Sequence, residues 1–262
     1  MRLHTGKRIF FYLRTMVRRI LSLLVVLLPM VLSAEGQTIL YWGDSITDGG
    51  WGRSGGSMSS AEERNHRDLN HLYGHSYMLL AASELESSHP EQGYRCHNRG
   101  ISGYTLQDLT ERWERDVEAL RPDVVSILIG TNDVARYLQG DRSRPFDVAA
   151  WEAQYRALLQ RTRQHNSEVK LMLCTPFVAA AGRLAASENF PEQNHLVAEC
   201  SRAVRRLARE FDAVLVDFEW LFLQLQRRYS VEPSYWIWDG IHPTPAGHRR
   251  MADLWLKQFR KL

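Results

Sequence analysis

The segment TILYWGDSITDGG, which runs from Thr38 to Gly50, decides the fold. Its first six residues form a short apolar run, which is typical of a buried β-strand. Ser45 follows this run directly, beside Asp44 and ahead of two glycines. A serine in this position is either a nucleophile presented at the end of a strand or an ordinary helix-capping serine. The segment alone does not distinguish the two roles, so the choice depends on the rest of the chain.

Four more apolar runs follow the first, separated by stretches of helical period. The predicted strands are TILYWG (38–43), YRCHNRG (94–100), DVVSILIG (123–130), VKLMLCT (169–175) and AVLVDF (213–218). The predicted helices cover residues 76–88, 106–120, 148–165, 193–211, 218–228 and 245–260. Thr105 is expected to cap the second helix, and Pro245 suits the first turn of the last helix after Thr244. This alternation predicts an α/β fold: a flavodoxin-like, three-layer α/β/α sandwich with a five-stranded parallel sheet.

The first 34 residues differ in composition from the rest of the chain. They hold six basic residues and no acidic one, then an apolar run over 20–32, then Ser33 and Ala34. This pattern predicts a signal peptide at 1–34 and a catalytic domain at 35–262. The protein is then expected to be exported, to the periplasm or outside the cell. Met16 is an alternative start. A retained single-span anchor is the other interpretation, but a thirteen-residue run interrupted by Pro29 is short for a bilayer.

The basic character of the chain belongs to this leader. The whole chain has 33 basic and 30 acidic residues, a net charge of +3, but without the leader 27 basic residues face the 30 acidic ones, a net of −3. The positive charge that would have indicated a nucleic-acid partner is therefore absent from the predicted catalytic domain, and we expect no such partner. Cys96, Cys174 and Cys200 are an odd number, so at least one thiol stays unpaired within the chain, and we expect no disulfide framework. Cys174 lies in an apolar strand and is expected to be buried.

Chemistry in such a sheet is expected in the loops that follow the strands, where ligands of parallel α/β proteins bind. A serine nucleophile needs a base and a group that orients the base. Asp239 and His242, in WDGIHPTPAGH, are three residues apart in a segment that Gly240 and Pro243 mark as a tight loop. This spacing lets the carboxylate of Asp239 accept from Nδ1 of His242 while Nε2 faces the serine.

Acyl transfer also needs hydrogen-bond donors for the oxyanion that forms. Gly100, in NRGISG, follows the second strand, and a residue without Cβ lets its N–H approach a ligand closely. Asn132, in IGTND, follows the third strand and offers a side-chain amide. Together with the N–H of Ser45, these groups fall after strands whose carboxyl ends share one edge of the sheet. The ordered set favours a serine hydrolase.

The blocks GDSIT, NRGISG, GTND and DGIHP resemble those of the SGNH (GDSL) hydrolase superfamily. The resemblance implies a nucleophile at Ser45, a base at His242 oriented by Asp239, and an oxyanion hole formed by Ser45, Gly100 and Asn132. It implies no cofactor and no metal.

The closer resemblance is to the bacterial acetylxylan esterase (carbohydrate esterase) group. It is carried by GDSITD, YGHSY, NRGISGYTLQDL, RWERDV, SILIGTNDVAR and DGIHPTPAGH. It implies hydrolysis of short acyl esters, with acetate on a polysaccharide such as xylan foremost. Tyr104 stands where that group often has asparagine, and the glycine- and serine-rich loop over 49–60 is longer; both departures lie on the expected substrate side.

The candidate substrate-binding residues are Trp42, Asp44, His75, Tyr104 and Trp238. Asp44 is also expected to shape the turn, and the two tryptophans are either core residues or a wall for a sugar ring. Asp133 is expected to hold its loop by hydrogen bonds.

Two other patterns are weaker. GRSGG (52–56) matches a nucleophile elbow formally, but Ser54 lacks the strand before it and the helix after it. His66, His71 and His75 lack an acidic or cysteine partner that would complete a metal site. Two other functions stay open: a lysophospholipase or thioesterase, which would need an apolar groove from the loop over 177–190, and a carbohydrate-binding protein without catalysis.

Overall fold

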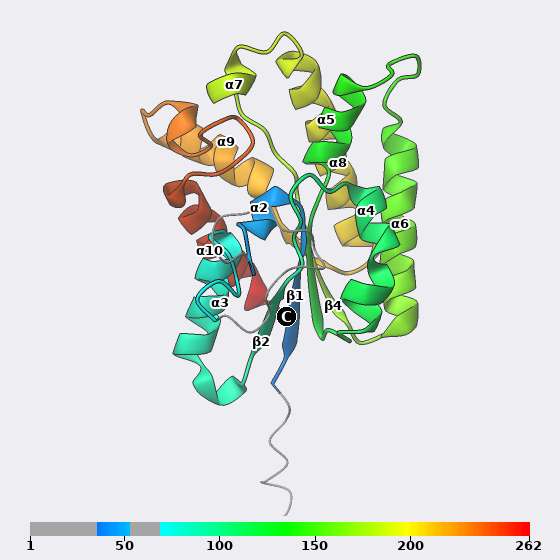
Figure 1. Cartoon of the computed structure of the whole chain (residues 1–262), viewed down its shortest axis with the longest axis vertical. Helices are drawn as coiled ribbons and strands as arrows, with labels where there is room; N and C mark the ends of the chain where they lie inside the picture. Colours follow the sequence, from blue (N-terminus) through cyan, green and yellow to red (C-terminus); the bar gives the residue numbers. More distant parts are fainter. Residues whose placement is uncertain (1–35, 53–68) are drawn as a thin grey trace, which may run out of the picture. The chain divides into compact units, whose positions relative to one another are not determined.

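The computed structural model describes residues 36–52 and 69–262 of the chain. Its centre is a five-stranded parallel sheet with the strand order β2-β1-β3-β4-β5 (Figure 1). The strands are β1 (Thr38–Gly43), β2 (Arg95–Asn98), β3 (Val124–Leu128), β4 (Lys170–Cys174) and β5 (Val214–Val216). Each coincides with a predicted strand. The residues of β1 and β3 are all buried, as expected for parallel strands covered on both faces.

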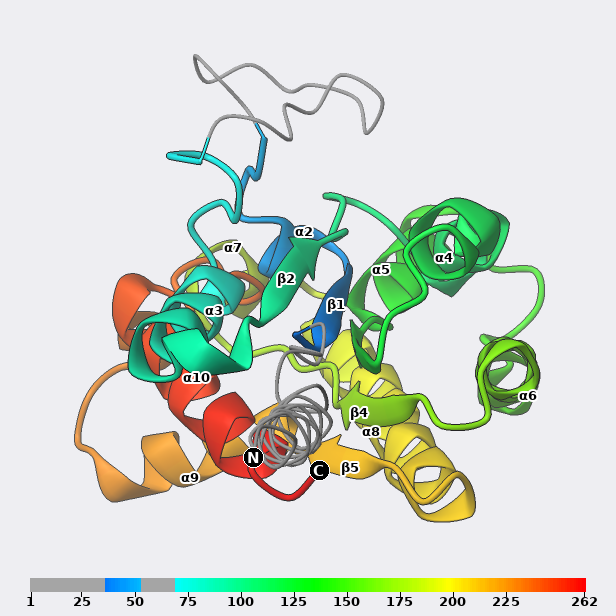
Figure 2. The same cartoon turned by 90° about the horizontal axis from the view of Figure 1, so that it is seen from below.

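Helices cover both faces of this sheet (Figure 2). The α-helices are α2 (Ser45–Asp48), α3 (Tyr77–Ser88), α4 (Leu106–Glu111), α5 (Thr131–Gln139), α6 (Val148–His165), α7 (Gly182–Ala185), α8 (Phe190–Glu210), α9 (Phe218–Arg228) and α10 (Pro245–Phe259). Short helical turns are η3 (Pro90–Gln92), η4 (Glu114–Glu118) and η5 (Pro233–Tyr235). One core joins the sheet to α3, α9 and α10, and a second joins its other face to α4, α6 and α8. The predicted three-layer α/β/α architecture is confirmed.

Side-chain caps explain where several helices begin. The hydroxyl of Thr244 accepts from the N–H of Gly247 and Pro245 opens α10, as predicted. Thr105 and Asp108 form a reciprocal capping box at the start of α4, so the predicted cap at Thr105 is also confirmed.

The predicted helix over 106–120 is wrong in one respect, because it divides into α4 and the π-helical turn η4. Asp116 in η4 is fully buried, and its carboxylate accepts from Nε1 of Trp42 on β1 at 3.0 Å and from the guanidinium of Arg112 at 2.9 Å. The wider turn brings this carboxylate inward to the sheet, a tertiary contact that helical periodicity does not contain. Helices α2, α5 and α7 were not predicted.

Residues 37–262 form one compact unit. The three cysteines are buried and free, which confirms the expectation for Cys174. None of the helices within the two described ranges is both long and apolar enough to span a bilayer. The predicted signal peptide lies outside the described residues.

Candidate active site

Ser45 is the first residue of α2, immediately beyond the carboxyl end of β1 (Figure 1). The helix cap is Asp44, whose Oδ1 accepts from the N–H of Ile46 at 3.0 Å, so the interpretation of Ser45 as a cap is wrong. The Asp44 side chain is 1% exposed, and burial raises its pKa to about 7. Its predicted role in shaping the turn is confirmed. Its predicted contact with substrate is wrong, because the carboxylate is enclosed at the start of α2.

The side chains of Ser45, His242 and Asp239 form a continuous hydrogen-bonded chain. Oγ of Ser45 lies 2.9 Å from Nε2 of His242, and Nδ1 of His242 lies 2.8 Å from Oδ2 of Asp239. Because an ionised carboxylate only accepts, Nδ1 is the donor to Asp239, and this leaves Nε2 to accept from the serine hydroxyl. The structure thus brings together, in the predicted order, three side chains that are up to 197 positions apart in the sequence.

Asp239 is held in place and kept ionised by its own loop. Its Oδ1 accepts from the backbone N–H groups of Ile241 at 2.9 Å and His242 at 2.7 Å. Burial by itself would raise the pKa of this carboxyl, but the hydrogen bonds from His242 and Ile241 outweigh burial and leave the pKa below its ordinary value. Asp239 is therefore a carboxylate at neutral pH, as its place beside the imidazole requires.

The predicted oxyanion donors lie at the same sheet edge. The N–H of Ser45 is the first of α2, where N–H groups have no partner within the helix. Asn132, in α5, donates from Nδ2 to the carbonyl of Tyr104 at 3.0 Å, which leaves its second amide hydrogen available. Gly100 packs against α2 so closely that a Cβ would lie 2.5 Å from the N of Asp48. Its N–H donates to Oδ1 of Asn98 at 2.9 Å, so an oxyanion would have to share it.

Two buried polar residues that the sequence reasoning did not single out brace this region. Nδ2 of Asn98 lies 2.9 Å from the Thr47 carbonyl and 3.2 Å from that of Asp48. Oδ2 of Asp48 accepts from both the N–H and the hydroxyl of Ser102, at 2.9 and 2.7 Å. These bonds tie the end of α2 to the loop that carries Gly100. The available signal was their polarity within the GDSITD and NRGISG blocks, since a polar side chain in a core needs partners.

The candidate substrate-binding residues occupy different surroundings. Trp42 is wholly buried in the core between β1 and α4, so its predicted role as a sugar wall is wrong. Trp238 is 59% exposed, and its ring lies nearly parallel to that of His242 at 6.4 Å. The side chain of His75 is exposed and that of Tyr104 half-buried. A substrate role for these three residues stays a prediction.

The weaker patterns and Asp133 can be placed in part. Ser54 and His66 lie outside the described residues. Within 36–52 and 69–262, no group of three histidine, cysteine or acidic side chains is arranged to hold a metal ion. Oδ1 of Asp133 accepts from the N–H of Leu106 and from Nε1 of Trp151, both at 3.0 Å, which confirms its predicted role in holding the loop.

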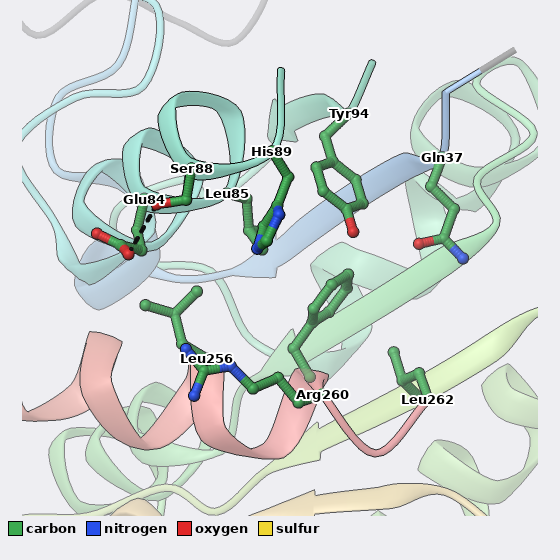
Figure 3. Close-up of a pocket in the computed structure, with 10 residues that line it drawn as sticks. Gln37, Glu84, Leu85, Ser88, His89, Tyr94, Leu256, Arg260 and Leu262 are labelled. Atoms are coloured by element: carbon green, nitrogen blue, oxygen red, sulfur yellow. Dashed lines mark hydrogen bonds between the residues drawn. The ribbon is translucent and has the colours of Figure 1, made fainter. Parts of the chain in front are cut away.

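The cavities formed by the described residues include the following two. One, of about 300 Å³, lies between the C-terminal halves of α3 and α10, with Glu84, Ser88 and Arg260 in its wall (Figure 3). Gln37 also lines it, which places it at the amino end of β1, at the end of the strand opposite to Ser45. The other, of about 570 Å³, lies between α8 and α9, and the loop from Phe177 to Phe190 contributes to its wall. The triad residues are not among those that line this second cavity.

A parallel α/β sheet with a hydrogen-bonded serine, histidine and aspartate at its carboxyl edge defines a serine hydrolase. The sequence model of the GDSL-like Lipase/Acylhydrolase family matches residues 41–250. The chain belongs to this family, and it is a serine carboxylic ester hydrolase. The resemblance to SGNH (GDSL) hydrolases is thereby confirmed.

Individual relatives agree with this assignment. The chain is 33% identical over 227 residues to an acetylxylan esterase of Geobacillus stearothermophilus, covering 86% of this chain and 94% of the relative. The crystal structure of that organism's acetylxylan esterase Axe2 superposes with a TM-score of 0.68 at 32% identity, over 86% of this chain and 94% of Axe2. A putative GDSL-like lipase from Parabacteroides merdae gives a TM-score of 0.71 at 32% identity, over 86% and 95% of the two chains.

Proposed function

We propose that this esterase removes short acyl groups, acetyl foremost, from a plant-type polysaccharide such as xylan or from its oligosaccharides. The observation that carries the proposal is the hydrogen-bonded chain from Ser45 through His242 to Asp239. The 33% identity to an acetylxylan esterase supports the choice of acetate on a carbohydrate. The lipid acylhydrolase alternative is the second candidate, because the family description and one putative lipase name that class only in general terms.

In the proposed mechanism, Nε2 of His242 takes the proton of the Ser45 hydroxyl as Oγ attacks the ester carbonyl. The imidazolium that forms is stabilised by the Asp239 carboxylate. The tetrahedral oxyanion is bound by the N–H of Ser45 and the second amide hydrogen of Asn132. The N–H of Gly100 is a third donor, which the oxyanion shares with Oδ1 of Asn98. His242 then protonates the leaving sugar hydroxyl, and an acetyl-Ser45 ester remains.

Deacylation reverses these roles. With the sugar gone, the neutral imidazole of His242 accepts a proton from water, and the resulting hydroxide attacks the acetyl-Ser45 carbonyl. Collapse of the second tetrahedral intermediate releases acetate and returns the proton to Oγ of Ser45. The mechanism draws all its proton transfers from one imidazole, so we assign no cofactor or metal to the reaction.

The test compares acetyl, butyryl and octanoyl nitrophenyl esters with acetylated xylo-oligosaccharides, using Ser45→Ala as the control. Release of acetate from both kinds of acetyl ester, lost in Ser45→Ala, is the expected result. A preference for the octanoyl ester would move the assignment to a lipid acylhydrolase. Turnover that survives in Ser45→Ala would contradict the assigned nucleophile.

We also propose that residues 1–34 are removed on export, which leaves a catalytic domain at 35–262 in the periplasm or outside the cell. The composition of the leader supports this proposal. Mass spectrometry of the protein isolated from its native host is expected to give an N-terminus at Glu35. An intact leader in that protein would favour the membrane-anchor interpretation.

A further inference from the structure

An exposed arginine stands at the catalytic pair. Arg183 lies in α7, beyond the carboxyl ends of the strands, the same end of the sheet as α2 (Figure 1). Its Nη2 is 3.5 Å from Oδ2 of Asp239. Its side chain is 65% exposed, whereas that of Asp239 is 6% exposed. The guanidinium thus touches the catalytic carboxylate on one side and faces solvent on the other.

The backbone that carries Arg183 is fixed to the catalytic loop. Gly182 has φ +48°, and a Cβ there would lie 2.5 Å from the carbonyl oxygen of Trp238. Leu184, on the other side of Arg183, is buried, and its Cβ would lie only 2.6 Å from a Cβ added at Gly240. These close contacts before and after Arg183 hold its backbone at a constant position relative to Asp239 and His242.

Asp239 does not depend on Arg183 for its orientation. Its oxygens already accept three hydrogen bonds from its own loop, two from backbone N–H groups and one from the His242 ring. The 3.5 Å separation from Arg183 is at the outer limit of a hydrogen bond. This single contact engages at most one of the five guanidinium N–H groups, and because the side chain is 65% exposed, other donors remain for a ligand.

These donors suit a particular kind of ligand. A guanidinium binds a carboxylate through two parallel hydrogen bonds, and this geometry distinguishes an acidic ligand from a neutral one. The ring of Trp238, exposed and nearly parallel to the His242 ring, provides an apolar face beside the same loop. A sugar ring with a carboxylate presents one apolar face and one anionic edge, which matches this pair.

We propose that Arg183 determines specificity by binding the carboxylate of a uronic acid close to the scissile acetyl ester. The preferred substrate is then an acetylated oligosaccharide that carries such an acidic sugar. This inference rests on the proposed deacetylase function and specifies the substrate class of the same site.

The experiment measures acetate release from acetylated xylo-oligosaccharides with and without a glucuronic acid branch. In Arg183→Gln, kcat/KM for the branched acidic substrate is expected to fall about tenfold, mainly through KM, while the neutral substrate changes less than about twofold. Arg183→Lys, which keeps the charge but not the fork, should retain part of the preference. Arg209→Gln is the matched control, because Arg209 is also exposed but lies at the end of α8, at the opposite edge of the sheet.

An equal fall of kcat/KM on both substrates would mean that Arg183 acts through Asp239, and no fall on either would mean that it contacts no substrate. Each result overturns the inference.

Inhibition of nitrophenyl acetate hydrolysis gives a second readout. Free glucuronate should compete more strongly than glucose in the wild type but not in Arg183→Gln, and equal inhibition would also overturn the inference. If nitrophenyl acetate is hydrolysed but neither oligosaccharide is, the proposed carbohydrate function fails, and the inhibition readout still judges Arg183 separately.

Discussion

Replacing His248 by asparagine should remove a pH dependence from the stability of the protein. His248 lies in the first turn of α10, and its Nδ1 accepts from the N–H of Tyr77, the first residue of α3, at 3.0 Å. Burial, with the nearby charge of His242, lowers the pKa of His248 from its ordinary 6.5 to about 4. The imidazole is therefore neutral in the folded protein at pH values above about 4, and in that form its Nδ1 can accept the N–H of Tyr77.

The sign and size of the effect follow from this pKa. Below pH 6.5 the unfolded chain binds a proton at His248 that the folded chain does not bind until pH falls to about 4. Acidification therefore lowers the free energy of unfolding, by about 3 kcal/mol over the whole range and about 2 kcal/mol between pH 7 and pH 5. Oδ1 of asparagine can accept in place of Nδ1 but does not titrate.

The assay is urea denaturation of the wild type and His248→Asn at pH 7, 6 and 5. Groups distant from His248 titrate alike in both proteins, so the pH dependence of the difference between the two unfolding free energies reports on His248 and its coupled neighbour His242. The variant should be less stable at pH 7, and the difference should shrink by about 2 kcal/mol at pH 5. A difference that stays constant with pH would refute the buried neutral imidazole.

Three further predictions concern the site and its support. Asp239→Asn places an amide N–H opposite Nδ1 of His242 and so favours the tautomer with a hydrogen on Nε2. The kcat for nitrophenyl acetate should therefore fall by about 10⁴-fold, while circular dichroism shows the fold retained. A fall of less than about tenfold would argue against the assigned orienting role. Trp42→Phe removes the 3.0 Å bond to buried Asp116 and should cost about 1–3 kcal/mol in urea denaturation while leaving KM unchanged; a raised KM at unchanged stability would restore the substrate role. Trp238→Ala should raise KM for acetylated xylo-oligosaccharides by several-fold more than KM for nitrophenyl acetate, and an equal change in both would exclude a sugar contact.

The arrangement of the site was accessible from sequence because two simple regularities determine it. Carboxyl ends of parallel strands share one sheet edge, so Ser45 and Asn132, which follow β1 and β3, had to lie near each other. The three-residue spacing of Asp239 and His242 left room for only a local turn, and that turn forms their hydrogen bond.

The parts that the sequence did not predict depend on contacts between distant residues. Trp42 adjoins the nucleophile in sequence, but the alternation of side chains along β1 sends it into the core, where Asp116 receives its N–H. The same contact divides the helix predicted over 106–120. Arg183 lies in a stretch without any motif, and the packing of Gly182 against Trp238 and of Leu184 against Gly240 places it beside Asp239.

The central claim is that Ser45 carries the acyl group, and the most direct test is to capture that intermediate. Rapid acid quenching during turnover of nitrophenyl acetate, followed by mass spectrometry of the peptides, should find one acetyl group on the peptide that contains Ser45, and none in Ser45→Ala. Acetate release with no acetylated peptide at any quenching time, or an acetyl group on another residue that persists in Ser45→Ala, would contradict the account.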